Sequence, residues 1–108
     1  MSGHLGDFEQ LILLALLRLG DQAYGVAIRR EIQDRTDRSI SIGALYTTLQ
    51  RMEGKGLVRS AIGEPTPERG GRRKKYYSLE TAGSRALAGS YRAWRGMTRD
   101  LESILDAL

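Results

Sequence analysis

The residues best suited to chemistry in this sequence lie in one short stretch, residues 43–51. At 100° per residue of helix, its small and hydrogen-bonding side chains fall on one side and its apolar ones on the other. Small residues let a helix backbone approach the major groove of DNA, where Thr, Gln and Arg reach base edges. Arg51 would suit a guanine, and Thr47 a thymine methyl. The predicted base-reading face consists of Gly43, Ala44, Thr47, Gln50 and Arg51, flanked by Tyr46 and Thr48.

A run of cations further along the chain is a second candidate site. The protein has 17 basic and 13 acidic residues, and residues 59–75 alone carry the whole net charge of +4. Adjacent glycines would let a hairpin tip approach a phosphate backbone or enter a minor groove, where cations release counterions. The alternative is a solvated basic loop with no partner. The predicted phosphate-binding residues are Arg69, Gly70, Gly71, Arg72, Arg73, Lys74 and Lys75.

Two residues at expected helix starts complete the predicted DNA contacts. Ser41, or alternatively Ser39, is a suitable N-cap for the helix that carries the base-reading face. Tyr24 opens an earlier helix, and a helix N-terminus with a Tyr hydroxyl suits a phosphate. Packing of Tyr24 in the core beneath the turn is an equally good interpretation.

Catalytic chemistry finds little support in this composition. There is no Cys, and the only His is His4, close to the N-terminus. No carboxylate pair lies on an apolar background, and the Ser and Thr residues lack a nearby base. We therefore expect no enzyme activity, no metal and no cofactor.

Hydrophobic periodicity predicts the elements that position these residues. Helices are expected over residues 7–19, 24–37 and 41–55, and strands over 57–61 and 74–79, joined by a long loop over 62–73. A final helix is expected over 80–108. This order is that of a mainly α winged helix-turn-helix with a two-stranded β wing. We expect a DNA-binding domain over 1–79 and a dimerisation helix over 80–108.

The final segment predicts a contact with a second copy. A helix of 29 residues would span about 43 Å and overhang a domain of this size. Its apolar residues alternate spacings of 4 and 3, as in a heptad seam. The first helix is apolar around most of its circumference and is expected to share the interface. The predicted interface residues are Leu11, Leu14, Leu87, Tyr91, Trp94, Thr98, Leu101, Leu105 and Leu108.

The chain has 108 residues, which favours one compact unit. No apolar run reaches the roughly 18 residues that a membrane span needs. The N-terminus lacks the basic and apolar segments of a secretory leader. We expect a cytoplasmic protein that associates with the nucleoid and has no membrane partner.

Several motifs in order resemble those of PadR-type transcriptional regulators, in the small subfamily with a single C-terminal helix. The resemblance implies homodimeric repressors that bind near-palindromic double-stranded DNA through the third helix and the wing, and that dimerise through the first and last helices. This chain departs from the common Gly-Thr-Leu-Tyr-Pro pattern at Ala44 and Thr47. The motifs are Tyr24-Gly25, Gly43-Ala44-Leu45-Tyr46, Leu49-Gln50-Arg51-Met52-Glu53, Gly56-Leu57-Val58, Gly70-Gly71-Arg72-Arg73-Lys74-Lys75-Tyr76-Tyr77-Ser78-Leu79 and Ala82-Gly83.

The same resemblance bears on Trp94, the only Trp of the chain. Some small PadR regulators that respond to planar drugs carry a Trp at the matching place, and the two rings of a dimer flank a central pore. The resemblance therefore implies a planar aromatic effector at Trp94. The alternative interpretation is that Trp94 packs in the dimer seam and binds no ligand. The implied pocket residues are Trp94, Tyr91, Thr98, Leu11, Ala15 and Asp7.

Two other functions remain open on the sequence. One is a DNA-binding protein of the same fold without an effector. The other is a protein-interaction module that uses a winged fold and does not read DNA.

Overall fold

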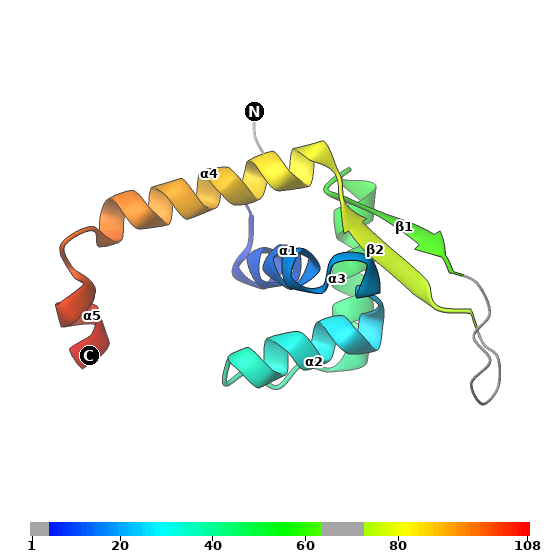
Figure 1. Ribbon diagram of the computed structural model, residues 1–108, viewed down its shortest axis with the longest axis horizontal. Helices are drawn as coiled ribbons and strands as arrows, with labels where there is room; N and C mark the ends of the chain where they lie inside the picture. Colours follow the sequence, from blue (N-terminus) through cyan, green and yellow to red (C-terminus); the bar gives the residue numbers. More distant parts are fainter. Residues whose placement is uncertain (1–4, 64–72) are drawn as a thin grey trace.

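The computed structural model describes residues 5–63 and 73–108. Three helices precede an antiparallel strand pair, and two helices follow it (Figure 1), which confirms the predicted winged helix-turn-helix class. The elements are α1 (Asp7–Leu19), the short 3-10 turn η1 (Gly20–Gln22), α2 (Gly25–Arg35), α3 (Ile42–Gly54), β1 (Val58–Ile62), β2 (Lys75–Leu79), α4 (Thr81–Thr98) and α5 (Glu102–Ala107).

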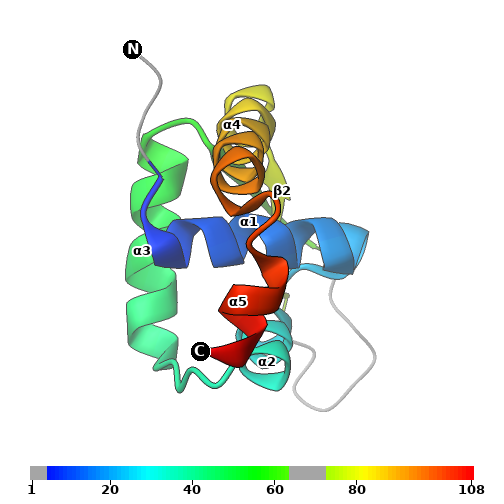
Figure 2. The same cartoon turned by 90° about the vertical axis from the view of Figure 1, so that its left-hand side faces the viewer.

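The core forms where α1 meets α2, α3 and the start of α4. Ile12 and Leu13 of α1 have no exposed surface, and Ile28, Leu45 and other buried residues pack in the same cluster. Figure 2 shows α1 running across the molecule, between α4 above and α2 below, with α3 beside it. Leu14 and Leu17 on the other side of α1 are exposed, and the expected contact of this side with a second copy stays a prediction.

The strand pair is attached to the helices through main-chain hydrogen bonds. Its register pairs Val58 with Leu79 and Ile62 with Lys75. The Tyr77 N–H donates to the Ala23 carbonyl across 2.8 Å, so β2 also contacts the link between α1 and α2. The wing therefore leaves the core from a fixed base.

The prediction of one continuous helix over residues 80–108 is wrong. The helix α4 ends at Thr98, and α5 begins only at Glu102. Asp100 between them has a φ of 67°, a left-handed conformation that Asp adopts more readily than most residues. The Leu101 N–H closes the turn on the Thr98 carbonyl across 2.9 Å. The predicted heptad seam is therefore interrupted after Thr98, although the molecule is still elongated, at 51 × 33 × 21 Å.

Within the described ranges, no helix combines the length and the apolar character that a bilayer crossing requires.

Candidate nucleic-acid interface

The turn between α2 and α3 is held by side chains of α2. Arg29 donates through Nε to the Ile40 carbonyl across 2.6 Å, and Gln33 Oε1 accepts from the Ile40 N–H across 2.9 Å. Both polar main-chain groups of Ile40 are thus satisfied, which a buried residue of a turn requires. Ser41 then caps α3, because its hydroxyl oxygen accepts from the Ala44 N–H across 3.1 Å. The start of α3 is therefore fixed relative to α2.

One side of α3 is buried and the other is open. Leu45, Leu49 and Met52 have no exposed surface and face the core. The five residues of the predicted base-reading face are all exposed: Gly43, Ala44, Thr47, Gln50 and Arg51. The structure thus brings together the residues that a recognition helix presents to a major groove.

The placement of Thr48 at the flank of this face is wrong. Thr48 is buried, and its hydroxyl donates back to the Ala44 carbonyl across 2.9 Å. A Thr in a helix satisfies its hydroxyl in this way when no other partner is available. The Thr48 hydroxyl is therefore not accessible to a base, whereas the side chain of Thr47 is exposed.

Tyr46 on the other flank is partly exposed and packs on the first turn of α2. A Cβ added at Gly25 would overlap the Tyr46 hydroxyl, so Gly25 leaves the space that this ring needs. Tyr46 also lies near the hydroxyl of Tyr77 on β2. Burial raises the pKa of the Tyr77 hydroxyl, and the nearby Tyr46 and Glu53 raise it further. The Tyr-Gly and Leu-Tyr motifs are therefore two halves of one contact between α2 and α3.

The base of the wing is packed on Tyr24. The Tyr24 and Tyr76 rings meet edge to face, with centroids 5.8 Å apart, and the two residues also form a β-bridge. The Lys74 ammonium lies 4.2 Å from the centre of the Tyr24 ring, a cation–π geometry. Tyr24 is half-buried and packs on the wing, where it holds a cation, and not in the core beneath the turn. A phosphate contact from its hydroxyl stays a prediction.

The neighbouring cations Arg73 and Lys75 are exposed. Across residues 5–63 and 73–108, the ion pairs include none formed by Arg73, Lys74 or Lys75. Their charge is therefore available to a polyanion. The predicted contacts Arg69, Gly70, Gly71 and Arg72 lie outside the described residues.

An internal ion pair that the sequence did not reveal joins α1 to the end of α3. The Glu9 carboxylate is buried, accepts from the Gly6 N–H across 2.8 Å, and pairs with Lys55 Nζ at 3.0 Å. Burial alone would raise the pKa of the Glu9 carboxyl, but the Gly6 N–H, Lys55 and Arg51 together hold this pKa below its usual value. Glu9 is therefore ionised at neutral pH. The only sequence signal was a Glu three residues after a possible helix cap.

The candidates for dimer contacts fall into two groups. Most are exposed, but Leu87 is buried in the core of its own chain and Leu11 is partly buried against that core. Thr98 is partly buried as well. The exposed candidates are Leu14, Tyr91, Trp94, Leu101, Leu105 and Leu108.

The implied effector pocket is corrected in part. Ala15 is buried in the core, so it cannot line an accessible pocket. Asp7 forms an ion pair with Arg38 in the turn before α3. The burial of Ala15 could not be predicted because α1 is apolar on nearly every side. Asp7 is exposed, so its contact with an effector stays a prediction.

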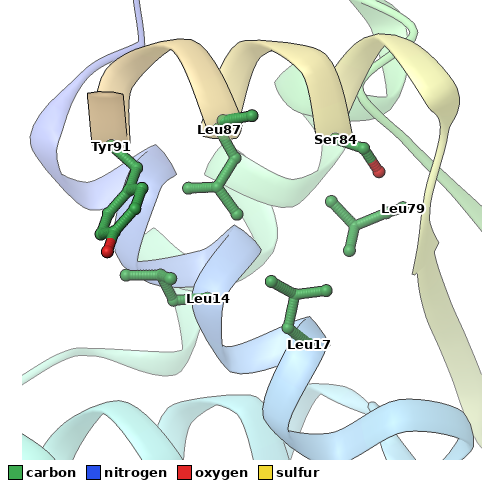
Figure 3. A pocket seen from close by; sticks show the side chains of 7 residues that line it. Leu14, Leu17, Leu79, Ser84, Leu87 and Tyr91 are labelled. Carbon is green, nitrogen blue, oxygen red and sulfur yellow. The ribbon is translucent and has the colours of Figure 1, made fainter. Parts of the chain in front are cut away.

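The structure instead shows an apolar groove between α1 and α4, of about 230 Å³. Figure 3 shows Leu14 and Leu17 rising from α1 toward Leu87 and Tyr91 of α4. The sequence did not predict Leu17, Leu79, Ser84 or Ala88 for any site. The continuous apolar run of α1 was the one signal for Leu17. The groove is lined by Leu14, Leu17, Leu79, Ser84, Leu87, Ala88 and Tyr91.

A fixed turn, an open hydrogen-bonding helix face and a cationic wing base together define a winged-helix DNA-binding protein. Comparison with known proteins agrees. The model of the "Transcriptional regulator PadR-like family" matches residues 13–89. An uncharacterized protein of Lysinibacillus sphaericus is 31% identical over 110 residues, which span 100% of this chain and 94% of that protein. The chain belongs to the PadR-like family of transcriptional regulators, and it is a DNA-binding regulator and not an enzyme.

Solved structures show the same fold. A PadR family transcription regulator from Clostridium difficile is 26% identical with a TM-score of 0.70, covering 91% of this chain and 98% of its own. A transcriptional regulator from Clostridium thermocellum is 26% identical with a TM-score of 0.68, covering 88% and 89%. A PadR-like regulator from Bacillus cereus, 20% identical with a TM-score of 0.73 over 91% and 90%, supports the fold alone.

Proposed function

We propose that this protein is a homodimeric transcriptional repressor that binds a near-palindromic operator. The observation that carries the proposal is the open face of α3, fixed at its start by Arg29, Gln33 and Ser41. Exposed Thr47 and Arg51 supply base contacts on this face. The cations at the wing base, Arg73, Lys74 and Lys75, contact phosphates beside it.

The proposed dimer places one α3 in each of two successive major grooves. In a two-fold symmetric dimer, such helices read half-sites about 34 Å apart, or a multiple of that spacing. The exposed apolar side chains of α1 and α4 provide the surface for the symmetric contact.

The proposal predicts a sequence preference that depends on α3. Selection of bound DNA from a random pool should recover a near-palindrome. Arg51→Ala or Thr47→Ala should change the preferred base at one position in each half-site, at a cost of about 1–3 kcal/mol. The matched control Arg85→Ala, an exposed cation on α4, should leave the recovered sequence unchanged. Equal affinity of the unaltered protein for the selected DNA and for random DNA would contradict a repressor and favour a protein-interaction module.

We further propose a planar aromatic effector at the centre of the dimer. Trp94 and Tyr91 are 69% and 56% exposed on the same side of α4. The Arg95 guanidinium lies 5.7 Å from the centre of the Tyr91 ring, so a flat molecule would stack on Trp94 and on the other face of Tyr91. Thr98 lies one turn beyond Trp94 on the same side. A ligand held there by both copies would act as an effector only if it distinguishes two dimer shapes.

Titration with planar aromatic dyes tests the effector. Trp94 is the only Trp, so its fluorescence reports this site alone. The proposal predicts saturable quenching that Tyr91→Ala weakens, while Tyr76→Ala at the wing base leaves the quenching unchanged. No quenching at high dye concentration would favour the effector-independent regulator.

A further inference from the structure

We propose that Asp7 and Glu9, in the first turn of α1, are positioning residues for DNA binding: they hold both ends of α3 on α1 and so set the half-site spacing that the dimer accepts. The inference rests on the proposed homodimeric repressor and names residues that fix its geometry. It follows from where these two acidic side chains lie and from the cations with which they pair.

Glu9 holds the last turn of α3. It is 5% exposed, and its carboxylate pairs with the Nζ of Lys55 at 3.0 Å. Lys55 caps α3, and its main-chain N–H donates to the Arg51 carbonyl across 3.0 Å. Removing the cation from a buried carboxylate is strongly destabilising, so this pair resists separation. The end of α3, which carries Arg51, is therefore fixed to α1.

Asp7 reaches the other end of α3. Two residues apart on a helix, Asp7 and Glu9 point in nearly opposite directions. The Asp7 carboxylate pairs with Arg38, in the turn that leads into α3. Within residues 5–63 and 73–108, the side-chain hydrogen bonds and ion pairs that join α1 to α2, α3 or the residues flanking α3 are these two. Besides its apolar packing, α1 thus holds α3 at one point near each end.

These two contacts bear on DNA binding because α1 also carries part of the proposed dimer surface. Leu14 and Leu17 are exposed on α1, so in the proposed dimer an α3 that is fixed to α1 is also fixed relative to the two-fold axis. Half-sites one helical turn apart are separated by about 34 Å, so one base pair changes the spacing by about 3.4 Å. A rigid link between α1 and α3 therefore rejects a site that is one base pair too long, whereas a loosened link tolerates it.

A charge swap between Asp7 and Arg38 tests the proposal. Fluorescence anisotropy at low salt would compare the selected operator with the same operator carrying one extra base pair between its half-sites. The extra base pair should weaken binding of the unaltered protein by about tenfold. In Asp7→Arg, Arg38→Asp or Glu9→Gln, this loss of affinity should fall to about threefold. The double variant Asp7→Arg with Arg38→Asp should restore the full loss, because opposite charges then face each other again.

The ratio of the two affinities separates positioning from other roles of these residues. A lost phosphate contact or a general loss of stability would weaken binding to both duplexes alike and leave the ratio unchanged. Asp7 and Arg38 are both exposed, so the swap does not depend on whether Glu9→Gln folds. Glu31→Gln is the matched control, because it breaks an ion pair with Arg35 that lies within α2. Its ratio should equal that of the unaltered protein.

The proposal is overturned if the single variants keep the ratio of the unaltered protein, or if the swap does not restore it. Failure of the proposed function would look different, since the unaltered protein itself would then select no operator or would bind DNA as a monomer.

Discussion

Replacing Arg73 and Lys75 with Ala is expected to weaken binding to every DNA sequence and to flatten its salt dependence. Both cations are exposed at the wing base. Each phosphate contact to duplex DNA contributes about −0.9 to the slope of log affinity against log salt. With about three contacts per subunit, the unaltered dimer should have a slope near −5. Losing two contacts per subunit should reduce the magnitude of the slope by about 3.6.

The same strand pair offers a matched control. Arg59 on β1 is exposed too, but it is paired with Glu80 at 2.6 Å, so its charge is already neutralised. Arg59→Ala should leave the slope near that of the unaltered protein in a fluorescence anisotropy titration over a range of salt concentrations. An unchanged slope in the Arg73 and Lys75 variant would show that the wing base does not contact phosphates. A change in sequence preference would contradict its assignment to the backbone.

Local patterns sufficed to predict the DNA-binding half of the fold. The stripe of Leu45, Leu49 and Met52 gave both the existence of α3 and its buried side, because one periodicity sets both. Thr48 was misplaced because a Thr at the edge of such a stripe can either present its hydroxyl to an outside partner or donate it to a carbonyl of its own helix. Only packing shows that Thr48 bonds to the Ala44 carbonyl.

The C-terminal half was harder to predict for a physical reason. Leu101, Leu105 and Leu108 continue the seam of α4 in phase, and the nearest Gly, Gly96, lies inside α4, two residues before its end, with no Gly or Pro at the break itself. The helix ends because Arg99 leaves the helical conformation, with a ψ of 131°, and Asp100 then adopts a left-handed one. The left-handed conformation is a weak preference of Asp and not a rule. Spacing alone therefore could not separate one long helix from two.

Contacts between distant segments were also invisible in the sequence. Gly25 was part of a motif, but its reason, the space taken by the Tyr46 ring, appears only when α2 and α3 are packed. The Glu9–Lys55 pair joins residues 46 positions apart. The groove between α1 and α4 could not be predicted either, because the sequence of a helix that is apolar all round does not show which of its leucines stay exposed.

The largest effect on stability is expected from Gly83→Ala. Gly83 lies at the start of α4, and an added Cβ would overlap the Leu57 carbonyl oxygen. This oxygen belongs to the main chain and accepts from the Glu80 N–H across 3.0 Å, so it cannot rotate away. The start of α4 must shift, which strains the core at Leu87 and weakens that hydrogen bond. We expect a loss of about 2–4 kcal/mol in the free energy of unfolding.

Gly89→Ala in the same helix is the matched control. Nothing lies within 4 Å of a Cβ added at Gly89, and Ala is favoured over Gly in a helix interior by about 0.5–1 kcal/mol. Urea denaturation at one fixed protein concentration should therefore rank the variants Gly89→Ala, unaltered and Gly83→Ala, from most to least stable. If Gly83→Ala were as stable as the unaltered protein, α4 would not meet the main chain at Leu57, just before β1, as closely as described. The proposed dimer face, which α4 carries, would then be free to move relative to the DNA-binding helices, and so could not hold two half-sites at a fixed spacing.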